Sequence, residues 1–384
     1  MKIAIAASGV GHVFRGMEGW CESIAETLSQ RGVDVTLFRG AGPKKNTYDV
    51  CIPCLKRTSK LAKLLSKFNS IGGWRVGLGS PGQIEAWSYG LLLLWKLRKG
   101  FDLVHIKQGN LANFLKLAQS VNILRIPFVL SNGQIAKPSF ISKFKFVQFL
   151  SPYEKKQMEK ALGECKHWFV IPNFVDTDKF SPLSKENSRR ELKIPLDSFV
   201  ILTVGAIKRY HKRMDYFLEE MGRLKNAVTL PIHIIIAGSR DRDTEFLIKR
   251  GKELLGKNLT VLTNLPKDSM PTVYNAADVF TLCSLQEAFG NVYIEAMSCG
   301  LPVIHHCYPV TEWITGDGGE SGDLRQRGAL CEILMRYIKN SGQILQKSVA
   351  GRKRAIAMFS KEIILSETIQ MYKTVIRSHD LIKS

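Results

Sequence analysis

The sequence lacks any apolar run close to the roughly 20 residues that a membrane-spanning helix needs. Its longest candidate, Tyr89 to Trp95, is by that measure a segment of a buried helix. A secretory leader is not expected either, because Ile3 to Ala7 is too short for the apolar part of a signal peptide and runs into a glycine loop. We therefore expect a cytoplasmic chain.

The sequence also lacks a second CxxC pair. It has eight cysteines, and only Cys51 and Cys54 form such a pair. One pair cannot complete a zinc ribbon, so the cysteines are expected to be reduced thiols of a cytoplasmic enzyme. Internal repeats and low-complexity tracts are absent as well.

Acidic residues are few. The chain has 34 Asp and Glu against 55 Lys and Arg, which gives a net charge of +21. Such a charge calls for an anionic partner: nucleic acid, anionic lipid or a phosphorylated substrate. With 384 residues, 45% hydrophobic and 23% charged, the chain is globular and long enough for two domains.

The opening residues follow a βαβ pattern. Lys2 to Ala7 is predicted as a buried strand, Trp20 to Arg31 as a helix and Val33 to Phe38 as a second strand. The glycine-rich loop between strand and helix does not have the G-x-G-x-x-G spacing of dinucleotide sites. Its glycines either let backbone approach a ligand or only make the turn, and the spacing leaves both open.

Alternating strands and helices continue along the chain. The strands expected next are Phe101–Ile106 and Pro127–Ser131, with helices over 84–99, 110–121 and 152–162. Three prolines between 172 and 195 indicate a domain boundary, and residues 173–198 are predicted as a linker.

A second series of strands follows the linker: Phe199–Val204, Pro231–Ala237, Leu259–Leu262, Val279–Cys283 and Pro302–His306. We therefore expect two Rossmann-like, doubly wound α/β domains, at 1–172 and 199–359, with ligands at the carboxyl ends of their strands.

Basic residues concentrate in the first half. Between Lys44 and Arg75 eight of them accompany a single acid, Asp49, and Leu61, Leu64, Leu65 and Phe68 recur at helical spacing. This helix, within 57–68, either lies on an anionic membrane or packs its leucines on the sheet. A second basic and aromatic cluster spans Phe140–Phe146.

The most informative stretch is Thr281–Ile304, which reads as strand, loop, helix, turn and strand. It carries Glu287 in the loop and Glu295 about one turn into the helix. Eight residues apart, the two carboxylates are expected to address different parts of one ligand rather than form a dyad. The helix start, at Asn291 and Val292, offers free N–H groups to an anion.

This stretch resembles the E-x7-E motif of the retaining glycosyltransferase family 4. Gly205 followed by Lys212, and Asn173 in Ile-Pro-Asn-Phe-Val-Asp, match the family too. The resemblance covers nearly the whole chain and is closer in the second domain. It implies the GT-B fold, in which the domains face a central cleft and a final segment, 360–384, returns to the first domain.

The resemblance also implies a site for a nucleotide-diphosphate sugar in the second domain. Glu295 would bind the ribose, Glu287 the sugar hydroxyls and Lys212 the diphosphate. The loop residues that would line the same pocket are Gly205, Phe289, Gly290, Asn291 and Val292. Neither a metal nor a cofactor is implied, because Lys212 and the helix start would stabilise the leaving diphosphate.

The sequence departs from the family at two places. Ala206 stands where an arginine is usual, so Lys208 or Arg209 would supply that charge. Asn132, which cannot act as a general base, stands where a histidine is usual near the reacting sugar carbon.

In the first domain, His12, Arg15 and Gly16 fall in the loop that would touch the donor phosphate or the acceptor. His105 is expected in a nearby loop, where it is a further candidate.

The resemblance thus predicts a retaining glycosyltransferase with a glycan or lipid-linked acceptor held by the basic first domain, peripheral to the inner face of the plasma membrane. One alternative is another enzyme on this fold, a sugar-nucleotide epimerase, a hydrolase or a phosphorylase. The remote alternative is a nucleic-acid binder, suggested by charge alone, and no RNA-binding motif accompanies the charge.

Overall fold

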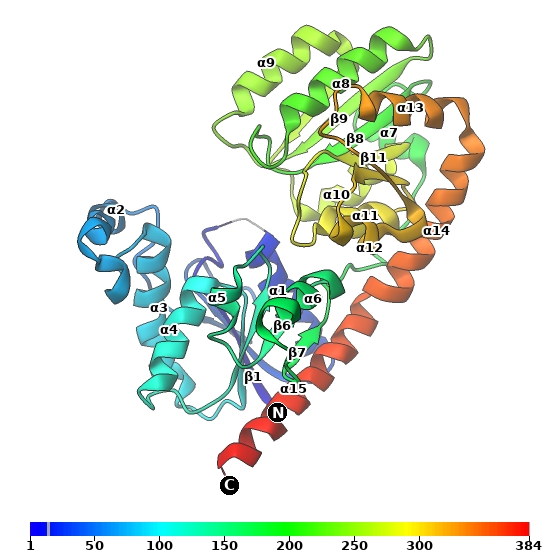
Figure 1. Ribbon diagram of the computed structural model, residues 1–384. Helices are drawn as coiled ribbons and strands as arrows, with labels where there is room; N and C mark the ends of the chain where they lie inside the picture. The colour runs from blue at the N-terminus through cyan, green and yellow to red at the C-terminus, as the bar shows by residue number, and fades with distance from the viewer. Residues whose placement is uncertain (14–15, 384) are drawn as a thin grey trace. The chain divides into compact units, whose positions relative to one another are not determined.

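The structure is a computed structural model that describes residues 1–13 and 16–383, and it divides into two compact units (Figure 1). The first unit comprises Met1–Pro172 and Leu365–Ser384, and the second comprises Asn173–Ile364. Among the described residues, no helix is long and apolar enough to cross a membrane. Arg15, expected in the first glycine loop, lies outside the described residues.

The first unit is built on a seven-stranded parallel sheet of order β3-β2-β1-β4-β5-β6-β7. Its strands are β1 (Lys2–Ala7), β2 (Asp34–Arg39), β3 (Asp49–Cys51), β4 (Leu103–Ile106), β5 (Phe128–Asn132), β6 (Val147–Phe149) and β7 (Trp168–Val170). β1 and β4 are buried on both faces, as expected for the centre of a parallel sheet.

Helices follow most of these strands. They are α1 (Gly16–Gln30), α2 (Lys60–Leu65), α3 (Pro81–Leu97), α4 (Gly109–Ser120), α5 (Pro138–Ile141), α6 (Pro152–Leu162) and α15 (Lys361–Lys383), with short 3-10 helices η1 (Ser66–Ile71) and η2 (Gly73–Val76). The core joins α3 and α4 to the sheet, where the Tyr89 hydroxyl donates to the Phe38 carbonyl at 2.7 Å. Leu365 onward in α15 belongs to this unit.

The helix expected within 57–68 is shorter than predicted. α2 begins after Ser59, whose hydroxyl accepts the Ala62 N–H at 3.1 Å, and ends at Leu65. Ala62 is its buried residue, whereas Leu61 and Leu64 are 49% and 56% exposed. The interpretation that the leucines of this helix pack on the sheet is therefore wrong for Leu61 and Leu64, whereas Leu65 is half-buried.

The second unit is built on a six-stranded parallel sheet of order β10-β9-β8-β11-β12-β13. Its strands are β8 (Phe199–Val204), β9 (Ile232–Gly238), β10 (Leu259–Thr263), β11 (Val279–Leu282), β12 (Val303–His306) and β13 (Gly319–Gly322). Two doubly wound parallel sheets confirm the predicted fold class.

Helices also connect these strands: α7 (Lys185–Glu191), α8 (Met214–Ala227), α9 (Thr244–Leu255), α10 (Met270–Asn275), α11 (Asn291–Ser298), α12 (Pro309–Thr315), α13 (Ala329–Lys339) and α14 (Ser341–Phe359), with η3 (Gly256–Asn258), η4 (Lys267–Ser269) and η5 (Gly316–Gly318). Residues 173–198, predicted as a linker, pack within this unit. The buried Arg189 of α7 donates to Asp278 at 2.6 Å and to the Ala276 carbonyl at 3.0 Å.

Strand order reverses direction once in each sheet, between β1 and β4 and between β8 and β11. Loops that leave the carboxyl ends of such neighbouring strands diverge and make room for a ligand. In the second unit these loops span 205–213 and 283–290, which contain the residues that the motif predicts.

Candidate functional site

Lys212 and Glu287 meet at the strand-order reversal of the second sheet. Lys212 Nζ donates a hydrogen bond to Glu287 Oε1, and His211 Nδ1 lies 3.9 Å from the same oxygen. The side chains of Lys212 and Glu287 are only 17% and 9% exposed. The two residues expected to bind different groups of one ligand are therefore partners of each other in this structure.

Backbone geometry brings Lys212 to that position. His211 and Arg213 adopt left-handed conformations, with φ of 70° and 49°, so the loop turns sharply before α8. The lysine stem then runs beside Gly205, where an added Cβ would lie 3.4 Å from Lys212 Cδ. A side chain at 205 would therefore begin in ordinary van der Waals contact with the lysine stem.

His211 adds a titratable ring to the pair. Burial lowers its pKa, Glu287 opposes that shift, and the nearby charges of Lys212 and Lys208 lower the pKa further. The imidazole is therefore neutral at pH 7, and the charge of Glu287 is balanced by Lys212.

Lys208 and Arg209, the two cations expected to supply the charge of the missing arginine, point to different surroundings. Arg209 contacts Asp243, 3.6 Å from Arg209 Nη2, and its guanidinium lies 5.1 Å from the Phe246 ring centre. It is thus directed toward α9. Lys208 lies close enough to His211 to lower its pKa, so Lys208 is the better placed of the two.

The start of α11 supplies the second part of the site. Gly290 has φ of 86°, and an added Cβ would lie 2.7 Å from the Tyr293 ring, so this turn requires glycine. Asn291 Oδ1 accepts a hydrogen bond from Asn173 Nδ2 at 2.7 Å, and Val292 is half-buried. Phe289 is buried against Phe359, which leaves its backbone as the part that a ligand could contact.

Glu295 lies on α11 with a partner of its own. The Tyr274 hydroxyl donates to Glu295 Oε2 at 2.8 Å. Burial raises the pKa of Glu295, while this hydrogen bond and the charges of Lys267 and Lys179 act in the opposite direction. The two motif glutamates thus have different partners. Sequence reasoning missed Tyr274 because a buried helix tyrosine looks like an ordinary core aromatic.

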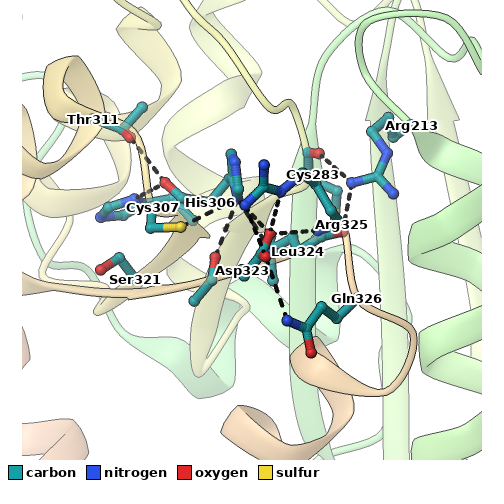
Figure 2. A network of polar contacts seen from close by, with 12 residues as sticks. Arg213, Cys283, His306, Cys307, Thr311, Ser321, Asp323, Leu324, Arg325 and Gln326 are labelled. Carbon is teal, nitrogen blue, oxygen red and sulfur yellow. Dashed lines mark hydrogen bonds and ion pairs between the residues drawn. The ribbon is translucent and has the colours of Figure 1, made fainter.

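A basic pocket of about 520 Å³ borders this arrangement through His211 and Gln286. Arg213, which the sequence reading did not single out, lines it. The Arg213 guanidinium donates to the Leu324 carbonyl at 2.6 Å (Figure 2). It also stacks 4.2 Å from the Tyr216 ring centre. The remaining lining residues are Arg209, Tyr210, Leu285, His306, Tyr308 and Arg325.

Figure 2 also shows His306, Cys307 and Asp323, a group of metal-type ligands whose donor atoms lie within 4.8 Å of one another. Protein donors already use these atoms. Arg325 donates to both Asp323 oxygens, at 2.7 and 2.9 Å, and the Leu324 N–H donates to His306 Nδ1 at 3.2 Å. The Asp323 carboxylate and the His306 imidazole are therefore already hydrogen-bonded within this loop.

Two Asp-x-Asp pairs, 176–178 and 241–243, are also held by protein donors. Asp176 accepts from Lys361 Nζ at 3.1 Å, and Asp243 accepts from the Arg209 N–H at 3.0 Å.

The candidates of the first unit lie at the carboxyl edge of its own sheet. Asn132 ends β5 and is 3% exposed, and Gly16 begins α1. His12 Nε2 lies 3.0 Å from Glu85 Oε2, and Glu85 also receives hydrogen bonds from Arg57 and Ser8. Burial alone would raise the pKa of Glu85, but these donors lower it to about 2, so His12 faces a permanent carboxylate.

His105, expected in a loop, lies inside strand β4. Its Nδ1 pairs with the Tyr372 hydroxyl of α15 at 2.6 Å, and burial together with the charge of Lys107 lowers its pKa to about 3. A neutral, buried histidine of this kind holds α15 on the sheet and is not available to a substrate.

Lys107, which sequence reasoning missed, crosses the end of β5 beside Asn132. An added Cβ at Gly133 would lie 2.7 Å from Lys107 Cε, and Lys107 Nζ lies 4.4 Å from the Trp20 ring centre. Burial lowers the pKa of Lys107 to about 7, and burial raises that of Glu154 to about 8. In the sequence this lysine looks like any polar loop residue.

Comparison with known proteins places the chain among enzymes that transfer sugars. Residues 184–333 match the family model described as glycosyl transferases group 1. Over 397 residues the chain is 24% identical to a D-inositol 3-phosphate glycosyltransferase of Corynebacterium urealyticum, an alignment that covers 94% of this chain and 91% of that protein. The protein of that name from Mycolicibacterium smegmatis is 30% identical over 213 residues, which cover 52% of this chain and 45% of that protein. The aligned region thus spans less than half of this second relative's length.

Solved structures share the fold over nearly the full length. Sucrose-phosphate synthase from Thermosynechococcus elongatus aligns with a TM-score of 0.73 at 18% identity, covering 98% of this chain and 99% of that one. Anabaena HepE in complex with UDP and glucose aligns with a TM-score of 0.75 at 16% identity, covering 97% and 99%. These likenesses show that the chain has the GT-B fold.

Proposed function

We propose that this chain is a group 1 glycosyl transferase that moves a sugar from a nucleotide-diphosphate sugar to an acceptor with retention of configuration, as a family 4 enzyme. The observation that supports the proposal is the contact between Lys212 and Glu287, with Glu295 on the adjacent helix. The names of the relatives support sugar transfer, and the complex of HepE with UDP and glucose supports a nucleotide sugar as donor.

Lys212 and Glu287 exchange partners in this mechanism. The donor diphosphate, a stronger anion than one carboxylate, takes Lys212 and leaves Glu287 free to accept hydrogen bonds from sugar hydroxyls. The N–H groups at the start of α11 face the same negative charge. As the glycosidic bond breaks, charge grows on the diphosphate, so Lys212 stabilises the transition state more than the ground state.

Glu295 fixes the nucleoside end of the donor. Its carboxylate accepts hydrogen bonds from the two ribose hydroxyls, while Tyr274 holds the carboxylate from behind. Asn173 orients Asn291 in the same way through the bond between their amides. Gly205, Lys208 and the backbone of Phe289 to Val292 complete the donor pocket.

Proton transfer does not depend on Asn132. In a retaining reaction on one face of the sugar, a donor phosphate oxygen accepts the proton of the attacking hydroxyl, and Asn132 only orients that hydroxyl. The mechanism requires no metal or cofactor, because Lys212 and the α11 start carry the charge stabilisation.

The acceptor is a glycan or lipid-linked molecule that binds the basic first unit, close to His12 and Gly16. The enzyme works in the cytoplasm, at the inner face of the plasma membrane. Nucleic acid is not a partner in this proposal.

A thermal-shift screen of nucleotide sugars tests the donor assignment. A true donor raises the melting temperature of wild type, and its effect is lost in Glu295→Ala because the ribose contacts are gone. Equal stabilisation of both proteins would sink the assignment of Glu295. Incubation of that donor with candidate acceptors, followed by NMR of the anomeric proton, separates retaining transfer from hydrolysis, epimerisation and phosphorolysis.

A further inference from the structure

Ten large apolar side chains are exposed on neighbouring segments of the first unit, each by 36% or more. We call this set the apolar ridge; it consists of Leu55, Leu61, Leu64, Phe68, Ile71, Trp74, Val76, Leu91, Leu92 and Trp95. Ile71 is 78% exposed and Trp74 55%. Soluble monomers rarely expose so much contiguous apolar surface unless it binds something.

The ridge is one surface rather than scattered residues. The Leu55 N–H donates to Ser88 Oγ at 3.0 Å, and Gln83 Nε2 donates to the Trp74 carbonyl at 2.8 Å, which ties both ends of 55–74 to α3. Ser88 shares a face of α3 with Leu91, Leu92 and Trp95 because they follow it by three, four and seven residues. α2 contacts α3, and η1 contacts both α2 and η2 (Figure 1).

Basic side chains surround the apolar ridge, and exposed acidic side chains are absent from the same segment. The exposed basic side chains of this region are Lys56, Lys60, Lys63, Lys67, Arg75, Arg98 and Lys99. Between residues 52 and 100 the only acid is Glu85, which is fully buried and bound to Arg57. Lys96 Nζ and Lys99 Nζ lie 4.7 and 5.9 Å from the Trp95 ring centre. Outward-facing apolar tips are therefore flanked by positive charge that the segment itself does not neutralise.

We propose that the apolar ridge docks this enzyme on an anionic lipid bilayer. Leucine, isoleucine and tryptophan tips enter the boundary between headgroups and acyl chains, and the surrounding lysines and arginines meet the anionic headgroups. Trp74 and Trp95, each beside a cation, occupy the interfacial level where tryptophan is favoured.

The positive charge of the ridge favours an anionic bilayer over the other partners that an apolar surface could bind. A second copy of the chain would bring the same seven exposed cations against these seven, so the ridge repels itself at low salt. A nucleic acid would engage the cations but leave the leucines and Ile71 without partners. An anionic bilayer satisfies both sets at once.

This inference rests on the proposed function only in expecting the acceptor in the same membrane. Docking itself needs neither donor nor acceptor. It can therefore succeed or fail while the donor site on the second unit behaves as proposed.

Vesicle sedimentation of the full-length protein tests the docking. Phosphatidylcholine vesicles with about 30% phosphatidylglycerol should pellet wild type at about 50 mM salt, and pure phosphatidylcholine vesicles should pellet much less. Ile71→Ser with Trp74→Ser should weaken binding at least about tenfold, because two inserted apolar groups are lost. Lys60→Ser, Lys63→Ser and Lys67→Ser together should weaken it about a hundredfold at low salt.

Matched controls come from the second unit. Leu345→Ser with Val349→Ser removes two exposed apolar side chains from α14, and Lys249→Ser, Lys252→Ser and Lys257→Ser together remove three exposed charges; both variants should bind vesicles like wild type. Melting temperatures show that every variant folds, and donor thermal shifts should be unchanged in all of them.

Three outcomes would overturn the proposal: no sedimentation of wild type with anionic vesicles, equal binding to neutral vesicles, or ridge variants that bind like the controls. A wild-type dimer in sedimentation velocity that Ile71→Ser with Trp74→Ser converts to monomer would assign the ridge to self-association instead. Steeply salt-dependent binding to random RNA without vesicle binding would assign it to nucleic acid.

Discussion

The ammonium group of Lys212 donates to the carboxylate of Glu287 across two loops that are 75 residues apart in the sequence. Each charge thus has its partner before any substrate arrives, and both side chains are largely buried. A buried pair of this kind is costly to break from one side, since removing one residue leaves the other charge unpaired. In the proposed mechanism, the donor diphosphate replaces the carboxylate as the partner of Lys212, which avoids that cost.

Replacing Lys212 tests this exchange. Lys212→Ala should lower kcat for sugar transfer by about a hundredfold, because the charge that stabilises the leaving diphosphate is gone. Glu287→Gln should leave nucleoside diphosphate affinity within about threefold of wild type, because the neutral amide does not compete with the diphosphate for Lys212. The rate of sugar transfer should fall, because the contact between the Glu287 carboxylate and the sugar is lost. Initial rates and calorimetric titration measure the two effects.

Arg209→Ala is the control for charge in the same loop. Arg209 is paired with Asp243, so its loss should change kcat much less than the loss of Lys212. An Arg209→Ala enzyme as impaired as Lys212→Ala would contradict the assignment of the diphosphate to Lys212.

The pH dependence of donor binding should report Glu295. Burial raises the pKa of this carboxyl, and its ionised form is the one that accepts ribose hydroxyls, so donor affinity should rise with pH until the group is ionised. Tyr274→Phe removes a hydrogen bond that favours the ionised form, so the midpoint should move to higher pH. Fluorescence titration from pH 4 to pH 8 measures the shift.

The sign for stability is the reverse of that for binding. Because the pKa of Glu295 is higher in the folded protein than the ordinary value of 4.5, its contribution to stability is full below that value and is lost as pH rises through the folded pKa. For donor binding, a Tyr274→Phe enzyme whose affinity has the same pH midpoint as wild type would show that a group other than Glu295 controls the pH dependence.

The Gly290 backbone makes the start of α11 intolerant of a side chain. Gly290→Ala combines a left-handed φ with a Cβ 2.7 Å from the Tyr293 ring, and should destabilise the fold by at least about 2 kcal/mol and weaken donor binding. Gly328→Ala is a matched control, with a left-handed φ of 92° and no atom within 4 Å of its added Cβ. It should cost about 1 kcal/mol and leave donor binding intact. Equal losses in both would remove the steric role of Tyr293.

How far the sequence predicts this molecule depends on the length of each pattern. β8 begins and ends where its β-branched run indicates, at Phe199 and Val204. β3, β6 and β7 went unrecognised because three residues are too few to show a period. The leucine spacing of α2 left membrane contact and packing on the sheet both open, because periodicity reports a common face and not what covers it.

The site divides in the same way. Motif spacing identifies Glu287, Glu295 and Lys212 as candidates, but the contact between Lys212 and Glu287 depends on β8 and β11 being neighbours, which is a property of topology. The direction of Arg209 depends on Asp243, 34 residues away, and no local pattern encodes that pair. The roles of Tyr274 and Lys107 likewise appear only once burial is known.

The buried histidine of the first unit predicts an acid-sensitive fold. Burial lowers the pKa of His105 to about 3 in the folded protein, against 6.5 ordinarily, so its contribution to stability is full above pH 6.5 and is lost as pH falls toward 3. At pH 4.5 this amounts to about 3 kcal/mol for a fully buried ring. At pH 7 the melting temperature of His105→Gln should be lower than that of wild type, because the Tyr372 contact is altered. Since glutamine cannot titrate, this melting temperature should approach or exceed the wild-type value by pH 4.5. His305→Gln in the second unit is the comparison. Burial lowers the pKa of His305 to about 4, so the pH range over which its contribution to stability is lost ends at a higher pH than for His105. Melting curves at half-unit steps from pH 7.5 to pH 4 measure both, and a constant difference between wild type and His105→Gln across that range would show that His105 carries a proton in the folded protein as readily as in the unfolded chain.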